Sequence, residues 1–501
     1  MKFPLIILLF VILFAPAKVN ADISLLIHEA TGYSGEMTGA GHVTVYLSNV
    51  CTDPPLVLRQ CRVGEPKGVV VATYPEFGPN SDYKWFAMPV LQYLYAVDSE
   101  QQIPLYANGK IRSFLRETSR VKYLSKIVPR SSETGLPPGR WSGVLGAAMN
   151  RDLYAFTVKT TPEQDLRFLE KYSTSPKGND FNIMFNNCAD FTRGIVNFYF
   201  PKSASRDFIN DFGMTTPKAL ARSFKGYAAK RPDLLFYITK YPQIDGTILR
   251  SSSIRNFTET AFTSKKYVIT QLLTKPSLLA IFAGTYFLTG YFDVDSAYRS
   301  YPSAAAARLN LEKNNLKQSA SAENEKILAD IKARQKTEKE RVFGEKRGWE
   351  IYRLAFYPML EKAVKERLFA DKNEVKSFFG DLEQQSTPFY DERGDLMLRV
   401  NNYGQEATLG LTRRNILGAN SDTRLAYKLM LAKVKYELEA SEKDRETMET
   451  FQENWQMLME LLRRSAALEP VQLPANARFL TTPVKKSTSS KMLELFRTIT
   501  H

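Results

Sequence analysis

The sequence divides into two stretches of unlike pattern, and their order constrains the fold more than any other feature. Over 22–240, short runs rich in β-branched and aromatic residues alternate with helical runs, whereas Ala, Glu, Lys, Gln and Arg predominate over 304–348. The first pattern is typical of an α+β domain, and the second is typical of long solvated helices. We therefore expect an α+β fold followed by a mostly α-helical C-terminal region.

Hydrophobic periodicity assigns the individual elements of the first stretch. Strands are expected at 23–27, 43–50, 69–74 and 233–241, and helices at 105–128, 161–172, 188–200 and 217–229.

The C-terminal region is expected to hold two long helices and a small hairpin. The expected elements are a long helix or helical pair at 304–348, a compact helical piece at 350–382, a β-hairpin of 396–400 with 407–411, and a second long helix at 422–467. Two long helices in one region suggest an antiparallel pair with methionines in its seam.

The expected organisation follows from these elements. It comprises a signal peptide at 1–21, an N-terminal domain at 22–245, a linker with an apolar segment at 246–300, a helical region at 301–470 and a loosely ordered tail at 471–501.

The first residues indicate export. A basic start at Lys2, an apolar stretch over 3–17 and small residues up to Ala21 match a secretory signal that is cleaved after Ala21. Cleavage would remove Lys2 and Lys18 and lower the formal net charge from +15 to +13. A basic exported protein is expected in the periplasm or cell envelope, with an anionic envelope polymer or lipid surface as its partner rather than nucleic acid.

A second apolar segment, 276–292, carries no charge between Lys275 and Asp293. It is slightly short for a membrane span, so an interfacial or buried helix is favoured over a crossing. Lys265, Lys266 and Lys275 precede it. For an exported chain, this positive charge agrees with a segment that lies on the outer face of the membrane.

Cysteine and histidine are scarce, with three residues of each. Three cysteines exclude a multi-cysteine zinc site, and neither a metal nor a cofactor is expected. In an oxidising compartment Cys51 and Cys61 can close a short disulfide loop. Cys188 is then left without a cysteine partner, as a reactive, intermolecular or buried thiol.

The residues around Cys188 predict a helix that begins at the cysteine. Asn186 or Asn187 can cap this helix. Amides and the dipole at a helix start stabilise a thiolate, and the same amides can receive an oxyanion. The plainer alternative is a small buried hydrophobic residue on an amphipathic helix. Asp190, in the first turn, is expected to complement the helix dipole.

A thiolate nucleophile needs a base, and the globular part offers His28 and His42. His42 follows a glycine-rich turn and opens an alternating strand, where small neighbours leave room for a substrate. His28 follows a buried-looking strand and is interpreted as structural.

Two motifs carry a family resemblance, Gly-His-x-x-x-Tyr-Leu at 41–47 and Phe-Asn-Asn-Cys-Ala-Asp-Phe at 185–191. Over 22–240 the chain resembles the circularly permuted papain-like cysteine hydrolases of the NlpC superfamily, which include relatives of lecithin:retinol acyltransferase. The resemblance implies a central antiparallel sheet with the histidine on a strand and the cysteine on a helix packed against it. It also implies that Cys188 is the nucleophile and His42 the base.

The family's third polar residue lies on the following strand. Antiparallel pairing of 43–50 with 69–73 would bring Tyr74 and Glu76 near His42, and these two are the candidates. Neither is the Asn or His that the family pattern implies.

The sequence therefore favours an exported thiol hydrolase or acyltransferase that attacks an amide or ester of an envelope component through a cysteine thioester. The peptide of peptidoglycan, a protein or a lipid could supply the acyl group. The alternative is a non-catalytic envelope scaffold or a membrane-surface binding protein.

Overall fold

The computed structural model of the chain describes residues 21–31, 40–53, 57–62, 65, 68–75, 82–139, 141–173, 178–180, 182, 184–244, 246–263, 268, 276–301, 304–309, 327, 329–337, 384, 386–402 and 405–412. Most of the expected signal peptide, the expected helices at 350–382 and 422–467 and the tail at 471–501 lie outside these residues.

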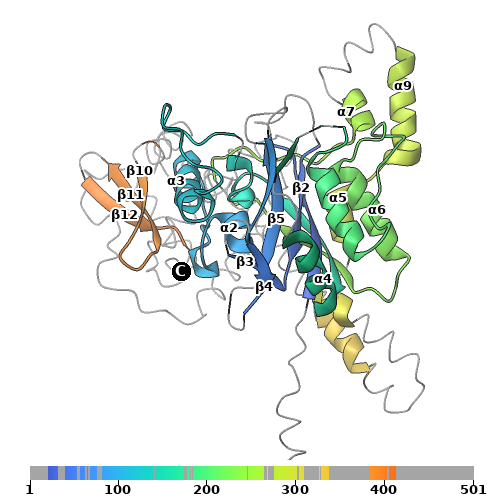
Figure 1. Cartoon of the computed structure of the whole chain (residues 1–501), viewed down its shortest axis with the longest axis horizontal. Helices are drawn as coiled ribbons and strands as arrows, with labels where there is room; N and C mark the ends of the chain where they lie inside the picture. The colour runs from blue at the N-terminus through green and yellow to red at the C-terminus, as the bar shows by residue number, and fades with distance from the viewer. Residues whose placement is uncertain are drawn as a thin grey trace, which may run out of the picture.

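A seven-stranded antiparallel sheet forms the centre of the molecule (Figure 1). Its strand order is β8-β6-β5-β2-β1-β7-β9. The strands are β1 (Ala21–His28), β2 (His42–Leu47), β5 (Val69–Pro75), β6 (Asp82–Pro89), β7 (Leu153–Thr160), β8 (Gly178–Asp180) and β9 (Phe236–Tyr241). The expected α+β class with a central antiparallel sheet is confirmed.

Helices cover both faces of this sheet (Figure 1). One face packs against α4 (Pro162–Ser173), α5 (Cys188–Tyr199) and α6 (Pro217–Ala229), and the other against α2 (Val90–Tyr95). Side chains alternate between the two faces as they must in a strand: Ile23, Leu25 and Ile27 of β1 join the core with α5 and α6, whereas Leu26 joins the core with α2.

Local capping and turns shift some expected boundaries. The helix expected at 105–128 is α3 (Gly109–Ser119) followed by a π-helical turn (Arg120–Leu124). It begins late because Asn108 is its N-cap and accepts from the amide of Ile111 at 2.9 Å. The strand expected at 43–50 ends at Leu47, and a turn leads into β3 (Val50–Asp53).

The expected linker at 246–300 is corrected, because this segment belongs to the N-terminal domain. It holds α7 (Phe257–Thr263), α9 (Pro276–Thr285), a π-helical turn η5 (Tyr286–Gly290) and α10 (Val294–Ser300). Phe292, Val294 and Ala297 lie in the same core as the helices α5 and α6. Apolar positions in 291–300 are too few to show this packing from periodicity alone.

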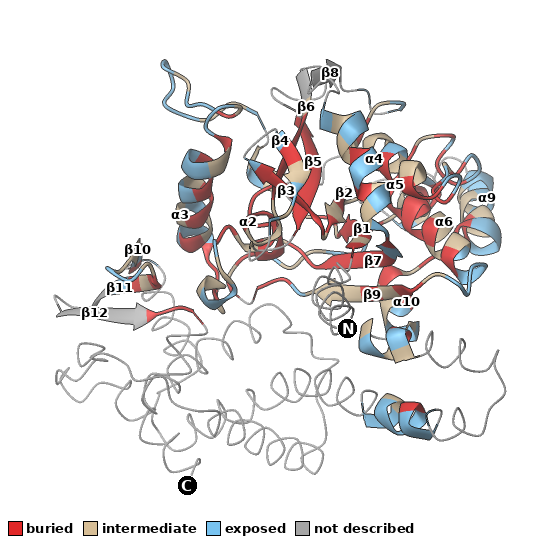
Figure 2. Cartoon of the chain, turned by 60° about the horizontal axis from the view of Figure 1, so that its bottom comes forward, coloured by how far each residue is buried: buried red, intermediate tan, exposed pale blue. Residues whose placement is uncertain are grey.

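The expected hairpin is present and has a third strand. β11 (Leu396–Asn402) pairs with β12 (Gln405–Gly410) and also with β10 (Ser386–Tyr390). Leu396 and Leu398 share a core with α3, and Lys110 Nζ donates to the carbonyl of Ser386 at 2.9 Å. This small sheet therefore packs beside α3, at the end of the molecule away from α9 (Figures 1 and 2).

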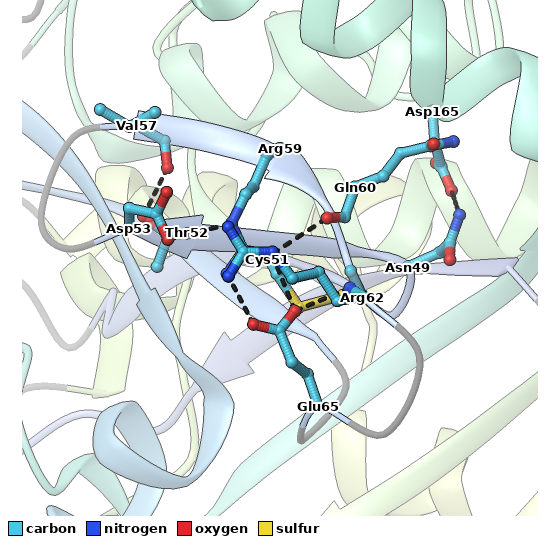
Figure 3. Close-up of a disulfide and its surroundings, with 11 residues drawn as sticks. Asn49, Cys51, Thr52, Asp53, Val57, Arg59, Gln60, Arg62, Glu65 and Asp165 are labelled. Carbon is cyan, nitrogen blue, oxygen red and sulfur yellow. Dashed lines mark hydrogen bonds and ion pairs between the residues drawn. A yellow bond between two sulfur atoms is a disulfide. The ribbon is translucent and has the colours of Figure 1, made fainter.

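A disulfide-linked hairpin follows β2 (Figure 3). β3 pairs with β4 (Val57–Gln60), and the expected bond between Cys51 and Cys61 is present, with Cα atoms 4.8 Å apart. Arg59 on β4 forms ion pairs with Asp53 at 2.9 Å and with Glu65 at 2.7 Å. The hairpin is thus closed by one covalent bond and by partly exposed ion pairs.

Replacing both Cys51 and Cys61 with alanine is expected to lower the free energy of unfolding by about 3 kcal/mol, because the bond closes a short loop in the unfolded chain. Urea unfolding followed by circular dichroism measures this loss. The control is Arg59→Met, which removes only partly exposed ion pairs and should cost about 1 kcal/mol or less. Equal losses in the two variants would contradict the prediction.

Candidate active site

The strands β2 and β5 separate at one end, and the start of α5 fills the position that β5 leaves. Their pairing covers only Val45–Leu47 with Val71–Val69, although β5 continues to Pro75. On the N-terminal side of Val45, the main chain of β2 contacts α5 instead of β5. The carbonyl of Val43 accepts from Thr192 Oγ1 at 3.3 Å, and the amide of Val43 interacts with the thiol of Cys188. The sulfur therefore lies beside the residue that follows His42.

Cys188 is the first residue of α5, as the sequence predicts. Asn187 is the N-cap, and its Oδ1 accepts from the amides of Ala189 at 2.8 Å and Asp190 at 3.0 Å. Asn187 is the cap rather than Asn186, whose main chain instead bridges to Asn182. Two of the amides at the helix start are thus already occupied.

Asp190 completes the capping box and is held by its own partners. Its carboxylate accepts from Arg206 at 2.7 Å and from Thr215 Oγ1 at 2.5 Å. These bonds tie the first turn of α5 to the loop that precedes α6. Asp190 therefore positions the helix start, in agreement with the expected role at the dipole.

The thiol of Cys188 is protonated at neutral pH. Burial raises its pKa to about 11, although the amides of Val43 and Ala189 oppose this rise. The expected stabilisation of a thiolate by the helix start is therefore present but weaker than desolvation. The side chain is nevertheless part-exposed.

His42 is the first residue of β2 and is also part-exposed. Its Nε2 atom is buried and has no hydrogen-bond partner in the part of the chain that the structure describes. Burial, and then the positive charge of Arg151, lower the pKa of His42 to about 3. The imidazole is therefore neutral at pH 7.

His28, interpreted from the sequence as structural, lies on β1 directly beside His42 on β2. The two are paired in the β1–β2 register, and their rings meet edge to face with centroids 5.2 Å apart. His28 is fully buried, and its Nε2 lies 3.3 Å from both Thr44 Oγ1 and the hydroxyl of Tyr93. These contacts fix the ring against which His42 rests.

Arg151 adds a buried positive charge to the cluster. Burial lowers its pKa, whereas the charges of Tyr93 and Cys188 act to raise it. One of its nitrogens donates to the carbonyl of Glu29 at 3.4 Å, and its Nε has no partner in the described chain. A guanidinium in this place disfavours a protonated His42 and favours a negative charge on the sulfur.

The two candidates for the third catalytic residue receive no support. Continuing the β2–β5 register would set Tyr74 opposite His42, but Tyr74 is buried and its hydroxyl donates to the carbonyl of Ile127 at 2.9 Å. Glu76 lies outside the described residues.

Sequence reasoning missed Tyr93, Arg151 and the place of His28. The two expected strands 23–27 and 43–50, paired as an antiparallel hairpin, would have set His28 across from His42. No local signal marks Tyr93 or Arg151, because long-range packing brings both of them to the site. No group of three or more His, Cys, Asp or Glu able to hold a metal ion occurs among the described residues.

Comparisons with known proteins identify no relative: no family model, curated protein or solved structure matches this chain.

Proposed function

We propose that the protein is an exported thiol hydrolase or acyltransferase that attacks an amide or ester of an envelope component. Cys188 is the nucleophile and His42 the base. The observation that carries the proposal is the contact of the sulfur with the amide of Val43, the residue that follows His42 in β2, at a capped helix start. The resemblance of the two motifs to the permuted papain-like hydrolases implies the same pair.

The proposed reaction proceeds in two steps. Sγ of Cys188 attacks the carbonyl carbon while its proton passes to His42, and the carbonyl oxygen takes the negative charge. The amides of Val43 and Cys188 are the candidate donors to this oxygen, since Asn187 already occupies the amides of Ala189 and Asp190. Collapse expels the amine or alcohol, which receives the proton from His42, and leaves a thioester on Cys188. Water then completes hydrolysis, or an acceptor amine or hydroxyl completes acyl transfer.

The resting Cys188–His42 pair is uncharged, which constrains this mechanism. The pKa of Cys188 is about 11 and that of His42 is about 3. Because these values differ by about 8, moving the proton from the thiol to the imidazole without attraction between the two charges costs on the order of 10 kcal/mol. Attraction between the thiolate and the imidazolium offsets part of this cost. Proton transfer therefore accompanies attack rather than preceding it.

A p-nitrophenyl acyl ester tests the proposal with the full-length protein. We expect a burst of p-nitrophenol and an acyl adduct at Cys188 that mass spectrometry detects. Cys188→Ala should abolish both signals, and His42→Ala should slow the burst by about 100-fold or more. Thr118→Val, which removes only a hydroxyl-to-carbonyl contact inside α3, serves as the control substitution. A folded wild-type protein that forms no adduct, or an adduct elsewhere, would assign the chain to the non-catalytic alternative.

Once an adduct forms, its fate separates the two reactions. Hydrolysis alone indicates a hydrolase, and faster turnover on adding an amine or alcohol indicates an acyltransferase. Parallel incubation with cell-wall fragments and phospholipid vesicles identifies which envelope component acylates Cys188.

A further inference from the structure

An exposed apolar surface lies at the α9 end of the molecule. We define it by six side chains from two segments: Phe208, Ile209 and Phe212 of the loop before α6, and Ile281, Phe287 and Leu288 of α9 and η5. Leu288 is 86% exposed and Phe208 is 75% exposed. Figure 2 shows α9 as largely exposed, and no residue of α9 is buried. Leaving so many large apolar side chains in water needs an explanation.

Specific contacts hold the two segments together, so the apolar surface has a fixed arrangement. Asn210 is fully buried between them: its Nδ2 donates to Thr289 Oγ1 at 3.2 Å, and its carbonyl accepts from the amide of Thr258 at 3.0 Å. Gly290 packs so closely on Asn210 that a Cβ atom there would lie 2.2 Å from Oδ1. The loop at 207–213 is therefore held against the end of η5.

The backbone at Phe212 supports a function for this surface. Its φ is +51°, in the left-handed region that costs a residue with a side chain roughly 1 kcal/mol. The ring is 53% exposed, and its edge-to-face contact with Phe257 is to another part-exposed ring. Because the ring is not buried within this chain, its packing does not offset the backbone strain. The strain therefore indicates that Phe212 gains stabilising contacts when a partner binds.

The sequence of the α9 segment suits an anionic partner. Over 260–292 it has three lysines, at 265, 266 and 275, and no acidic residue. Among the described acids of the neighbouring elements, Asp207 pairs with Arg222 and Glu259 with Lys218, each at 2.6 Å, and Asp211 is fully buried. An anionic surface therefore meets little repulsion from these acids.

A full membrane crossing does not fit. By length and composition Pro276–Ser300 is apolar enough to span, but Val294 and Ala297 lie in the protein core. The part outside that core, Pro276–Gly290, would reach only about 22 Å at 1.5 Å per residue, short of the roughly 30 Å hydrocarbon layer. The segment instead suits insertion to the depth of the headgroups.

We infer that this apolar surface binds the face of an anionic lipid bilayer, with α9, η5 and the loop at 207–213 inserted together. The inference goes beyond the proposed chemistry at Cys188 and does not depend on it. Export places the surface at a membrane whose lipids carry negative charge.

Co-sedimentation of the full-length protein with vesicles tests the inference. The wild-type protein should bind vesicles of phosphatidylglycerol and phosphatidylcholine in equal parts, and should bind pure phosphatidylcholine more weakly. Leu288→Glu and Phe208→Glu should each weaken binding by about tenfold or more, because each removes an exposed apolar side chain that inserts into the bilayer and adds a charge that the anionic lipids repel. Leu136→Glu, at a 66% exposed leucine in the loop after α3, is the matched control and should leave binding unchanged.

Three outcomes would overturn the inference. These are no binding to anionic vesicles by a wild-type protein with a cooperative thermal transition, equal weakening by Leu136→Glu and Leu288→Glu, or resistance of the bound protein to extraction at alkaline pH, which would indicate a span. If vesicles do not bind and Leu288→Glu instead abolishes a contact with a soluble protein, the surface is a protein interface. Acylation at Cys188 is measured separately, so failure of either idea leaves the other standing.

Discussion

Alkylation of Cys188 by a neutral reagent such as iodoacetamide is expected to accelerate about tenfold per pH unit from about pH 7 to pH 10. The thiolate is the reacting form, and burial raises the pKa of Cys188 to about 11, so only about one molecule in ten thousand is ionised at pH 7. The sign follows directly, because the ionised fraction rises with pH until it passes the pKa. Stopped-time labelling followed by mass spectrometry measures the rate.

The chain suits this measurement because its other two cysteines form the disulfide. The labelling rate of the Asn187→Ala variant provides a comparison, because this substitution frees the amides of Ala189 and Asp190 at the helix start. Rapid labelling that does not change between pH 5 and pH 8, in roughly the range where a preformed thiolate–imidazolium pair is stable, would show that the resting site is charged. That result would contradict the neutral pair described above.

Acid should destabilise the fold through the two histidines of the site. The pKa of His42 is lowered to about 3 and that of His28 is lowered well below its usual value, while both should titrate near 6.5 in the unfolded chain. The unfolded state then binds more protons below pH 6.5, so the stability these residues contribute is lost as the pH falls from that value. Between pH 7 and pH 5 His42 is expected to cost about 2 kcal/mol, and His28 acts in the same direction.

Carboxyl groups act in both directions over the same range, so the test compares variants rather than absolute values. Burial raises the pKa of Asp211 to about 6, which opposes the loss, and Arg120 lowers that of Glu117, which adds to it. Urea unfolding at pH 7 and pH 5 should show a loss that is about 2 kcal/mol smaller in His42→Gln than in the wild type. The same loss in both proteins would mean that His42 accepts a proton in the folded state.

The sequence predicted those parts of the fold that depend on local pattern. The helix at 217–229 is α6 with the same limits, and Asn187 caps a helix that starts at Cys188 as expected. The strands β6 and β7 were not expected from periodicity, because neither alternates strictly between apolar and polar residues, and β7 is buried at every position except Lys159. Buried strands of this kind resemble buried helix segments in sequence.

Less of the site than of the fold could be predicted. Cys188 and His42 stood out because cysteine and histidine are scarce, whereas Arg151 is one of 68 lysines and arginines. The low pKa of His42 also depends on burial and on Arg151, neither of which a local motif encodes. Prediction of protonation states requires the assembled sheet.

The meeting of β2 with the start of α5 has an evolutionary consequence. Val43 meets Thr192 and Cys188 through its main-chain carbonyl and amide, so exchange of Val43 for another apolar residue that fits the core leaves both groups in place. Divergent sequences can therefore vary this side chain within the limits of the core while they retain the alignment of sulfur and strand. Similarity between homologues would then fade at this position sooner than the architecture does.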